Sequence, residues 1–339
     1  MKNHNQNTVS DIDQVAIYLR RAKLTDIKVS TQELIGDASE RRYVRVYLPD
    51  SSSQILSVYP EPIDPNTLPF LNVARLLQRM PLPIPNILGL ESDLGIIILE
   101  DLGKVTLQRQ LQHTTTEHRE ALYIEAIELI IRMQQRGNDL ASNAYFPFEL
   151  AFNFEKLMWE LDFFTQNFLI SHRGVNLSTS EQESLQEEFS SLSHEIAREP
   201  RVFCHRDYHA RNLMLHKGRL HVIDFQDARM GPDTYDLVSL LRDSYFEHDS
   251  LFIDQMIGYY LEQTRSSERL SFLERFDLMS VQRHLKALGT FGYQTATIKN
   301  AGYQDDIPRT LCYLKNIFKL HSRFSKLHKL LASHLIELE

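Results

Sequence analysis

Three residues able to do chemistry stand close together in one stretch of the chain, VFCHRDYHARNLMLHKGRLHVIDFQDA, over residues 202–228. Asp207 and Asp224 are 17 residues apart, and Asn212 lies between them. The segments NLML and RLHVID are expected to pair as a hairpin, which Asn212 enters and Asp224 leaves at the same end. One amide oxygen and one carboxylate then face the same point. This arrangement suits Mg²⁺, which takes one or two protein ligands and completes its shell with water and phosphate oxygens.

Asp207 precedes the hairpin in a loop, where its carboxylate can accept a proton from a hydroxyl nucleophile. Phosphoryl transfer from ATP needs a metal, an oriented hydroxyl and a base, and little else. The segment HRDYHARN matches the spacing of the kinase catalytic loop, and DFQ stands where kinases carry Asp-Phe-Gly. The sequence therefore predicts ATP and Mg²⁺ as cofactors, Asp207 as the catalytic base, and Asn212 and Asp224 as metal ligands. Asp236, early in an apolar helix, is expected to accept hydrogen bonds from the catalytic-loop backbone.

The elements that position these residues fall into two parts. Between residues 27 and 60, strand-like segments separated by turn residues predict three antiparallel strands, and a helix and a further strand pair follow up to residue 100. Beyond Gly103 the pattern is mostly helical, with helices expected over 116–137, 147–172 and 180–199. The sequence thus predicts an α+β fold of two lobes. Residues 1–102 would form a β-rich nucleotide-binding lobe, and residues 103–339 a helical lobe with the catalytic loop, metal site and acceptor site.

The small lobe departs from the usual kinase pattern where the nucleotide phosphates are held. Kinases use a lysine on the third strand and a glutamate on the next helix, but QILSVYP contains no lysine and TLPFLNVARLLQRM no acidic residue. The turn IGDASERRY offers another clamp, in which the Ser39 hydroxyl and the Arg42 guanidinium, with Arg41 beside it, can hold phosphate oxygens. The backbone from Glu100 to Leu102 is expected to meet the adenine edge.

Composition narrows the class of protein. The chain of 339 residues has a net charge of −8, which disfavours a nucleic-acid binder, because such proteins need clustered basic side chains. The N-terminal segment lacks the apolar core of a secretory signal, and no apolar run approaches the about 18 residues of a membrane span. Cys204 and Cys312 are expected to be reduced and buried. We expect a cytoplasmic enzyme with a small-molecule substrate and no nucleic-acid or membrane partner.

The chain resembles the aminoglycoside phosphotransferase–choline kinase superfamily, which has the protein-kinase-like fold. Within it, the chain is similar to the bacterial anomeric N-acetylmuramate/N-acetylglucosamine kinases of peptidoglycan recycling, which also lack the strand lysine. The resemblance covers nearly the whole chain and rests on GDASERRYVR, LEDLG, HRDYHARNLML, VIDFQDARMGPDTYDLVSLLRD and VQRHLKALGTFGY. Glu40 is a departure, because an aromatic residue is expected after GDAS.

The resemblance implies transfer of the ATP γ-phosphate to the anomeric hydroxyl of N-acetylmuramate or N-acetylglucosamine. A uridylyltransferase would then use the sugar 1-phosphate. Arg211, four residues after Asp207, is expected to bind the lactyl carboxylate of N-acetylmuramate. Arg283, on one late helix with His284 and Lys286, is a second candidate for substrate binding. Glu155 is a further candidate for the acceptor site.

Two other functions fit the same residues. A kinase for another small alcohol or for an aminoglycoside needs an acidic acceptor pocket, which Glu155, Glu160 and Asp162 could supply. A non-catalytic ATP-binding regulator is the second alternative, although such a protein has no need of all three catalytic and metal-binding residues. A protein kinase is disfavoured, because the few residues between DFQ and GPDTYD leave no room for a long activation segment.

Overall fold

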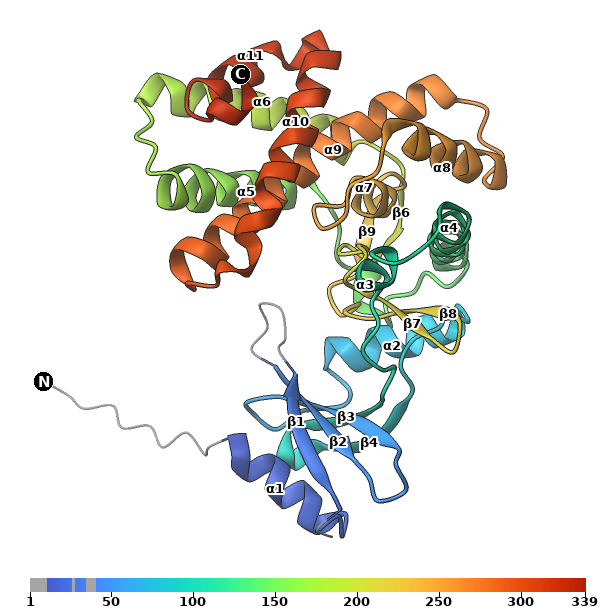
Figure 1. Cartoon of the computed structure of the whole chain (residues 1–339). Helices are drawn as coiled ribbons and strands as arrows, with labels where there is room; N and C mark the ends of the chain where they lie inside the picture. Colours follow the sequence, from blue (N-terminus) through green and yellow to red (C-terminus); the bar gives the residue numbers. More distant parts are fainter. Residues whose placement is uncertain (1–10, 26–27, 35–40) are drawn as a thin grey trace, which may run out of the picture.

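The computed structural model describes residues 11–25, 28–34 and 41–339, so the predictions made for Ser39 and Glu40 lie outside the described residues. A small lobe built from the N-terminal part of the chain lies below a larger helical lobe in Figure 1. The α2 helix and the hairpin of β7 and β8 lie where the two lobes meet (Figure 1).

The small lobe contains a five-stranded antiparallel sheet with the strand order β1-β2-β3-β5-β4. Its elements are α1 (Asp11–Arg21), β1 (Ser30–Leu34), β2 (Arg42–Tyr47), β3 (Ser53–Val58), α2 (Pro69–Arg79), β4 (Ile87–Glu91) and β5 (Ile96–Glu100). The last strand in sequence, β5, lies inside the sheet between β3 and β4. The connector to the large lobe therefore leaves from the interior of the sheet rather than from its edge.

The two faces of the sheet belong to different hydrophobic cores. Side chains alternate between faces along a strand, and Val44 of β2 packs with Val15 and Tyr18 of α1 in a small outer core. Ile97 and Leu99 of β5 point to the opposite face and belong to the main core, which continues through the large lobe. The inner face of the small lobe is therefore continuous with the interior of the large lobe.

Helix α2 lies on this inner face and is attached to the large lobe by several side chains, among them Asn72 and Phe70. The side chain of Asn72 donates a hydrogen bond to the Ala144 carbonyl at 2.9 Å and accepts one from the Phe146 amide at 3.0 Å. The ring of Phe70 stacks on that of Phe225 with the centroids 4.9 Å apart. Phe225 belongs to the DFQ segment, so α2 packs directly against the predicted metal site.

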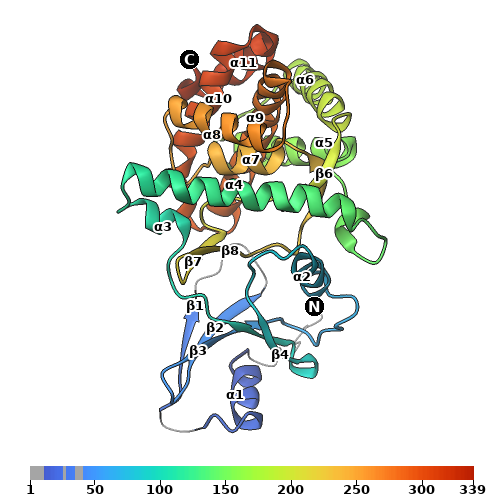
Figure 2. The ribbon, with the colours of Figure 1, turned by 90° about the vertical axis from the view of Figure 1, so that its right-hand side faces the viewer.

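The large lobe is mainly helical. Its helices are α3 (Leu107–Leu111), α4 (Thr116–Asp139), α5 (Phe154–Phe164), α6 (Thr179–Ala197), α7 (Tyr235–Leu241), α8 (Ser250–Gln263), α9 (Arg269–Gly292), α10 (Ile307–Leu320) and α11 (Ser325–Ala332). Its strands form two antiparallel pairs, β6 (Arg201–Cys204) with β9 (Arg229–Pro232), and β7 (Leu213–His216) with β8 (Arg219–Val222). The α4 helix runs across the lobe on the side facing the β7–β8 hairpin (Figure 2). The predicted α+β two-lobe fold is confirmed.

The expected continuous helix over 147–172 is wrong. The chain makes a 3-10 turn at Phe146–Phe148, and α5 begins only at Phe154, where the Asn153 side chain caps it by accepting a hydrogen bond from the Lys156 amide at 2.9 Å. After α5 the helix widens into a π-helix over Thr165–His172. The β6–β9 pair was also not predicted, because strands of four residues leave too short a pattern to recognise.

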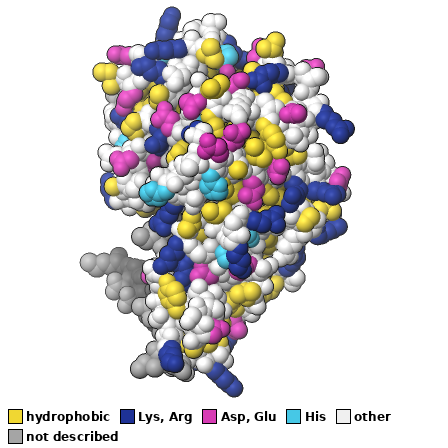
Figure 3. Space-filling view, turned by 45° about the vertical axis from the view of Figure 1, so that its right-hand side comes forward, with side chains coloured by type: hydrophobic (Ala, Val, Ile, Leu, Met, Phe, Trp, Pro, Cys, Tyr) yellow, Lys and Arg dark blue, Asp and Glu magenta, His cyan; other side chains and the backbone are white. Residues whose placement is uncertain are grey.

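The structure can be compared with what the composition predicted about surface charge, membrane-spanning helices and the two cysteines. On the face in Figure 3, acidic and basic side chains are interspersed with apolar ones. None of the helices in the described parts of the chain is long and apolar enough to span a bilayer. Both cysteines are free thiols. Cys204 is buried as expected, but the expectation for Cys312 is wrong, because it lies on the exposed side of α10.

Candidate active site

The β7–β8 hairpin brings the two predicted metal ligands to one end, and the expected pairing is confirmed. Leu213 pairs with Val222, and beyond this pair the Ile223 amide donates a hydrogen bond to the Asn212 carbonyl at 3.1 Å. Asn212 and Asp224 therefore flank the open end of the ladder. Both line one cleft between the lobes, with a volume of about 530 Å³.

The oxygen atoms of these two residues fit a hard divalent cation. Asn212 donates its side-chain amide to the Asp207 carbonyl at 2.9 Å, so its Oδ1 is the atom left for a ligand. The carboxylate of Asp224 is 43% exposed and accepts a hydrogen bond from the Gln226 amide at 3.0 Å. The described residues contain no cluster of three or more His, Cys, Asp or Glu side chains able to hold a metal. A cation here would therefore take most of its ligands from water and a bound nucleotide, as Mg²⁺ does.

The catalytic loop is held in an unusual backbone conformation by buried acceptors. Arg206 and Asp224 have φ angles of +85° and +62°, in the left-handed region that costs energy for residues other than glycine and that clusters at functional sites. Asp236 on α7 accepts hydrogen bonds from the amides of His205 at 2.6 Å and Arg206 at 3.0 Å, which confirms its predicted structural role. The His205 ring contacts the Ile223 carbonyl at 2.9 Å and ties the loop to the end of β8.

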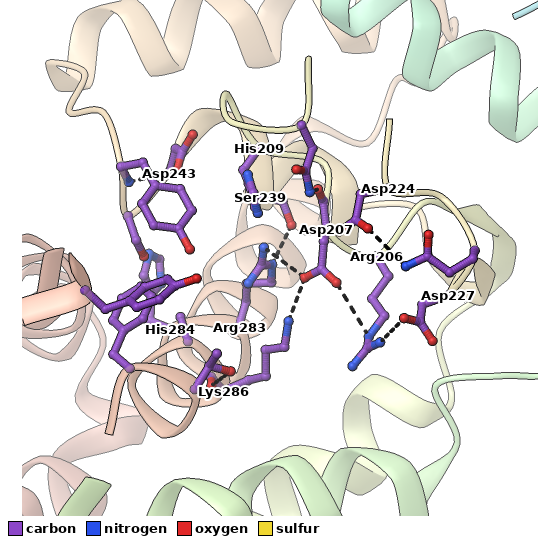
Figure 4. A pocket seen from close by; sticks show the side chains of 18 of the residues that line it. Arg206, Asp207, His209, Asp224, Asp227, Ser239, Asp243, Arg283, His284 and Lys286 are labelled. Atoms are coloured by element: carbon purple, nitrogen blue, oxygen red, sulfur yellow. Dashed lines mark hydrogen bonds and ion pairs between the residues drawn. The ribbon is translucent and has the colours of Figure 1, made fainter. Parts of the chain in front are cut away.

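Asp207 lies in the cleft among three cationic side chains (Figure 4). Its Oδ1 accepts a hydrogen bond from the Lys286 ammonium at 2.7 Å, and the guanidinium groups of Arg283 and Arg206 each approach its carboxylate to 3.9 Å. Burial alone would raise the pKa of Asp207, but the charges of Lys286, Arg206 and Arg283 outweigh burial and hold the pKa well below its usual value. The predicted base is thus held deprotonated.

Helix α9 supplies two of these cations from one side, because Arg283 and Lys286 are three residues apart. Arg283 also donates to the Ser239 hydroxyl on α7. Burial lowers the pKa of Lys286, although the charge of Asp207 opposes that effect. Burial likewise lowers the pKa of His209, which also lines the cleft, to about 3, so this imidazole stays neutral and adds no charge. Lys286, Arg206 and Arg283 are therefore the main sources of positive charge around Asp207.

Of the two adjacent arginines near the predicted phosphate turn, the structure brings Arg41 to the cleft and not Arg42. Arg41 immediately precedes β2 and lines the cleft, with Nη2 3.4 Å from Oδ1 of Asp224. Arg42 is the first residue of β2, and its Nε donates to the Glu33 carboxylate on β1 at 2.9 Å. Successive side chains on a strand point to opposite faces, which separates the two neighbours.

The predicted adenine contacts lie at the end of β5. The amide of Glu100 donates to the Asn86 carbonyl at 2.8 Å, and its carboxylate accepts from the Asn86 side chain at 2.7 Å, so this carboxylate faces away from the cleft. Leu102 is buried in the connector. Between them, Asp101 accepts two hydrogen bonds from Arg45 at 2.6 and 2.9 Å. This buried ion pair fixes the connector against β2.

Of the three predicted acceptor-site residues, only Arg283 lines the cleft. The guanidinium of Arg211 contacts the Asp306 carboxylate at 3.1 Å and stacks on the Tyr245 ring at 3.7 Å. Tyr245 does line the cleft, so Arg211 supports the wall from behind. Glu155 is exposed in the first turn of α5 and does not reach the cleft.

Sequence reasoning did not select several residues that shape the cleft on the large-lobe side. Tyr245, Phe291 and Tyr303 line it, and the last two rings stack with their centroids 5.5 Å apart. No sequence signal separated these aromatic residues from ordinary core residues. Lys286 had a signal, because it lies on the same helical face as Arg283.

Glu160 is buried on α5, where it accepts a hydrogen bond from Gln282 at 2.9 Å.

Comparison with known proteins defines the class of this chain. Residues 30–272 match the family described as the phosphotransferase enzyme family. The chain is 33% identical over 303 residues to the N-acetylmuramate/N-acetylglucosamine kinase of Neisseria meningitidis serogroup B, with 87% of this chain and 88% of that protein covered. It is 32% identical over 315 residues to the protein of the same name from Pseudomonas aeruginosa, with 90% of each covered.

Solved structures show the same fold at lower identity. Choline kinase from Cryptosporidium parvum superposes with a TM-score of 0.64 at 14% identity, covering 93% of this chain and 98% of that one. An ADP-bound aminoglycoside phosphotransferase superposes with a TM-score of 0.60 at 14% identity, covering 89% and 97%. The chain belongs to the phosphotransferase enzyme family. The predicted enzyme class, a phosphotransferase with the fold of the aminoglycoside and choline kinases, is confirmed.

Proposed function

We propose that this enzyme transfers the γ-phosphate of ATP to the anomeric hydroxyl of an amino sugar, N-acetylmuramate or N-acetylglucosamine. The observation that carries the proposal is the position of Asp207, a deprotonated carboxylate between the oxygen ligands at the end of the hairpin and two cations of α9. The acceptor sugars come from the curated relatives, which bear the name of kinases for these two compounds.

The proposed reaction is a direct transfer. The acceptor hydroxyl donates its proton to Asp207 as its oxygen forms a bond to the γ-phosphorus. The bond between that phosphorus and the bridging oxygen breaks, and ADP leaves with the electron pair. Asn212 and Asp224 would hold Mg²⁺, which neutralises phosphate charge when it is bound. A base of low pKa suits this acceptor, because a hemiacetal hydroxyl is more acidic than an ordinary alcohol and the proton moves late in a loose transition state.

The large-lobe side of the cleft suits a sugar that carries a carboxylate. Tyr245, Phe291 and Tyr303 offer aromatic surface against which the apolar face of a sugar ring can pack. Arg283 and Lys286 supply positive charge for the lactyl carboxylate of N-acetylmuramate. This assignment moves the carboxylate contact from Arg211, which is paired with Asp306, to the α9 cations.

None of the three acids that could form an aminoglycoside pocket, Glu155, Glu160 and Asp162, lines the cleft, which disfavours an aminoglycoside as acceptor. A polycationic antibiotic requires an acidic pocket, whereas Glu155 is exposed outside the cleft and Glu160 is within 4.0 Å of Lys156 and Arg206. We further propose that the product, a sugar 1-phosphate, is the substrate of a uridylyltransferase. A cytoplasmic location follows from the use of ATP as the donor.

The test is an ADP-release assay with a panel of acceptors. N-acetylmuramate and N-acetylglucosamine should support turnover, and their 1-O-methyl glycosides should bind as inhibitors without reacting, because they lack the proton that Asp207 accepts. An aminoglycoside kinase would be indifferent to a blocked anomeric position. Phosphorylation of a polyamine antibiotic or choline, with neither amino sugar accepted, would contradict the proposal. ATP binding without turnover on any acceptor would favour a non-catalytic regulator.

A further inference from the structure

The small lobe lacks a positive charge at the usual phosphate-binding position of kinases, the third strand. The positions of β3 that face the inner side of the sheet are Ser53, Ile55 and Ser57, because the alternate ones contribute to the outer core. None of these three carries a charge, and α2 has no acidic side chain to pair with a lysine. Another residue must therefore supply the positive charge for the donor phosphates.

A cation reaches this region from the neighbouring strand. β2 pairs with β3 so that Tyr43 lies directly opposite Ser57. The guanidinium carbon of Arg41 lies 5.8 Å from the centre of the Tyr43 ring and 5.8 Å from that of Tyr59, within range of attraction to both ring faces. The Arg41 side chain is only 10% exposed. The two rings thus hold a largely buried positive charge in the wall of the cleft.

Arg41 is aimed at the predicted metal site. Its Nη2 lies 3.4 Å from Oδ1 of Asp224, and Arg41, Asn212 and Asp224 line the same cleft. Mg²⁺ in phosphotransferases bridges phosphate oxygens and a carboxylate. A guanidinium in contact with that carboxylate is therefore within reach of the same phosphates.

We propose that Arg41 binds the phosphates of the donor nucleotide and replaces the strand lysine of other kinases. The proposal rests on the proposed function for one point, the use of a nucleoside triphosphate as donor. A guanidinium carries five N–H donors in a planar fork, so one edge can bond phosphate oxygens while another remains on Asp224. The compact ammonium group of a lysine cannot cover both partners in this way.

The test compares ATP with adenosine, which lacks the phosphates. Calorimetric titrations of both compounds into the wild-type protein, Arg41→Gln and Arg41→Lys are made without any acceptor sugar. The Arg41→Gln change should weaken ATP binding by about 10- to 100-fold and leave adenosine binding within about twofold. Arg41→Lys should fall between the wild type and Arg41→Gln. Adenosine binding also reports whether the small lobe of each variant is folded.

Two other arginines make the comparison specific. Arg21 forms exposed ion pairs with Glu91 and Asp93 in the small lobe, outside the cleft, so Arg21→Gln should bind ATP as the wild type does. The Arg42→Gln variant tests whether Arg42, rather than Arg41, binds the phosphates. A loss of ATP affinity in Arg42→Gln, with none in Arg41→Gln, would assign the phosphates to Arg42 and overturn the proposal.

The remaining outcomes are also decisive. Equal losses of ATP and adenosine affinity in Arg41→Gln would mean that Arg41 maintains the lobe rather than binding phosphate, and would overturn the proposal. Unchanged affinity of Arg41→Gln for ATP would mean that Arg41 only neutralises Asp224, and this result would also overturn the proposal. Because no acceptor is present, failure of every amino sugar as a substrate would remove the proposed acceptor and leave the role of Arg41 untouched.

Discussion

The ammonium nitrogen of Lys286 lies 2.7 Å from Oδ1 of Asp207, so a helix near the end of the chain places a cation directly on the predicted catalytic base. The two residues are 79 positions apart in sequence. An acceptor hydroxyl that bonds to Asp207 must share or replace this ammonium contact. Lys286 therefore sets both the basicity of Asp207 and the charge that meets an incoming substrate.

Replacing Lys286 by methionine should raise the pKa of Asp207, because a nearby opposite charge typically lowers a carboxyl pKa by about 1–3 units. In the wild type, the low pKa keeps the Asp207 carboxylate charged as the pH falls. In the variant the carboxylate has a higher pKa, so it becomes protonated, and activity is lost, at a higher pH. The measurement is the acidic limb of the pH profile of kcat/KM. Lys326→Met is the control, since Lys326 pairs with Glu187 on the surface at 2.7 Å. An acidic limb that does not move would show that Lys286 does not tune the base.

Asp207→Asn should abolish turnover and retain nucleotide binding. Loss of a general base costs about 10²–10⁴-fold in rate, whereas the asparagine leaves the hydrogen bond from Asn212 to the residue 207 carbonyl in place. The measurement is kcat, with ATP affinity determined separately by calorimetry. A variant whose kcat stays within about threefold of the wild type, far below that range, would show that Asp207 is not the base.

Asp224→Ala should weaken binding of Mg·ATP much more than binding of metal-free ATP. The carboxylate contacts the nucleotide through the cation, so only the metal-bound form loses a ligand. Loss of the negative charge beside Arg41 should favour binding of metal-free ATP, because the nucleotide is itself an anion. Titrations with Mg²⁺ and with EDTA check this outcome. Equal losses under both conditions would remove Asp224 from the set of metal ligands.

Gly292→Ala should destabilise the large lobe, because a β-carbon at this position would lie 2.4 Å from the Asn167 carbonyl oxygen and 2.7 Å from the Cα of Phe168. Both contacts are with the backbone of the π-helix, which cannot move aside like a side chain. The expected loss is about 1–3 kcal/mol of unfolding free energy, measured by denaturant titration.

Gly258→Ala in α8 is the matched control for this substitution. Among the described residues outside its own helical backbone, the new β-carbon would meet only the end of the Arg269 side chain, at 3.7 Å. Alanine has the higher helix propensity by about 1 kcal/mol, so this variant should be as stable as the wild type or more so. A Gly292→Ala protein as stable as Gly258→Ala would mean that α9 and the π-helix do not pack closely in solution.

The hairpin and the positions of Asn212 and Asp224 at its open end could be predicted because the information is local. Apolar segments on each side of a short turn determine the pairing of β7 with β8, and that pairing determines where Asn212 and Asp224 meet. Asp236 could be predicted on similar grounds, since an acid early in a buried helix needs nearby donors. The α+β division into lobes likewise follows from the change of hydrophobic period near Gly103.

The residues that surround Asp207 could not be predicted in the same way, because they depend on long-range packing. Arg211 is four positions from Asp207, yet Asp306 and Tyr245 from later segments draw its guanidinium behind the cleft wall. Lys286 is distant in sequence and reaches the carboxylate only because α9 packs beside the catalytic loop. Which of Arg41 and Arg42 faces the cleft depends on where β2 begins. Sequence patterns define such strand boundaries poorly.

The attachment of α2 to the large lobe has a consequence for control of the enzyme. Protein kinases are commonly switched on and off by moving the equivalent helix, which carries one half of the phosphate-binding pair. Here a swing of α2 would break both Asn72 hydrogen bonds and separate Phe70 from Phe225. The helix carries no acidic partner for a phosphate-binding residue. Such a movement would therefore cost stability without separating a phosphate-binding ion pair. The contacts of α2 with the large lobe therefore oppose the helix movement by which protein kinases are controlled.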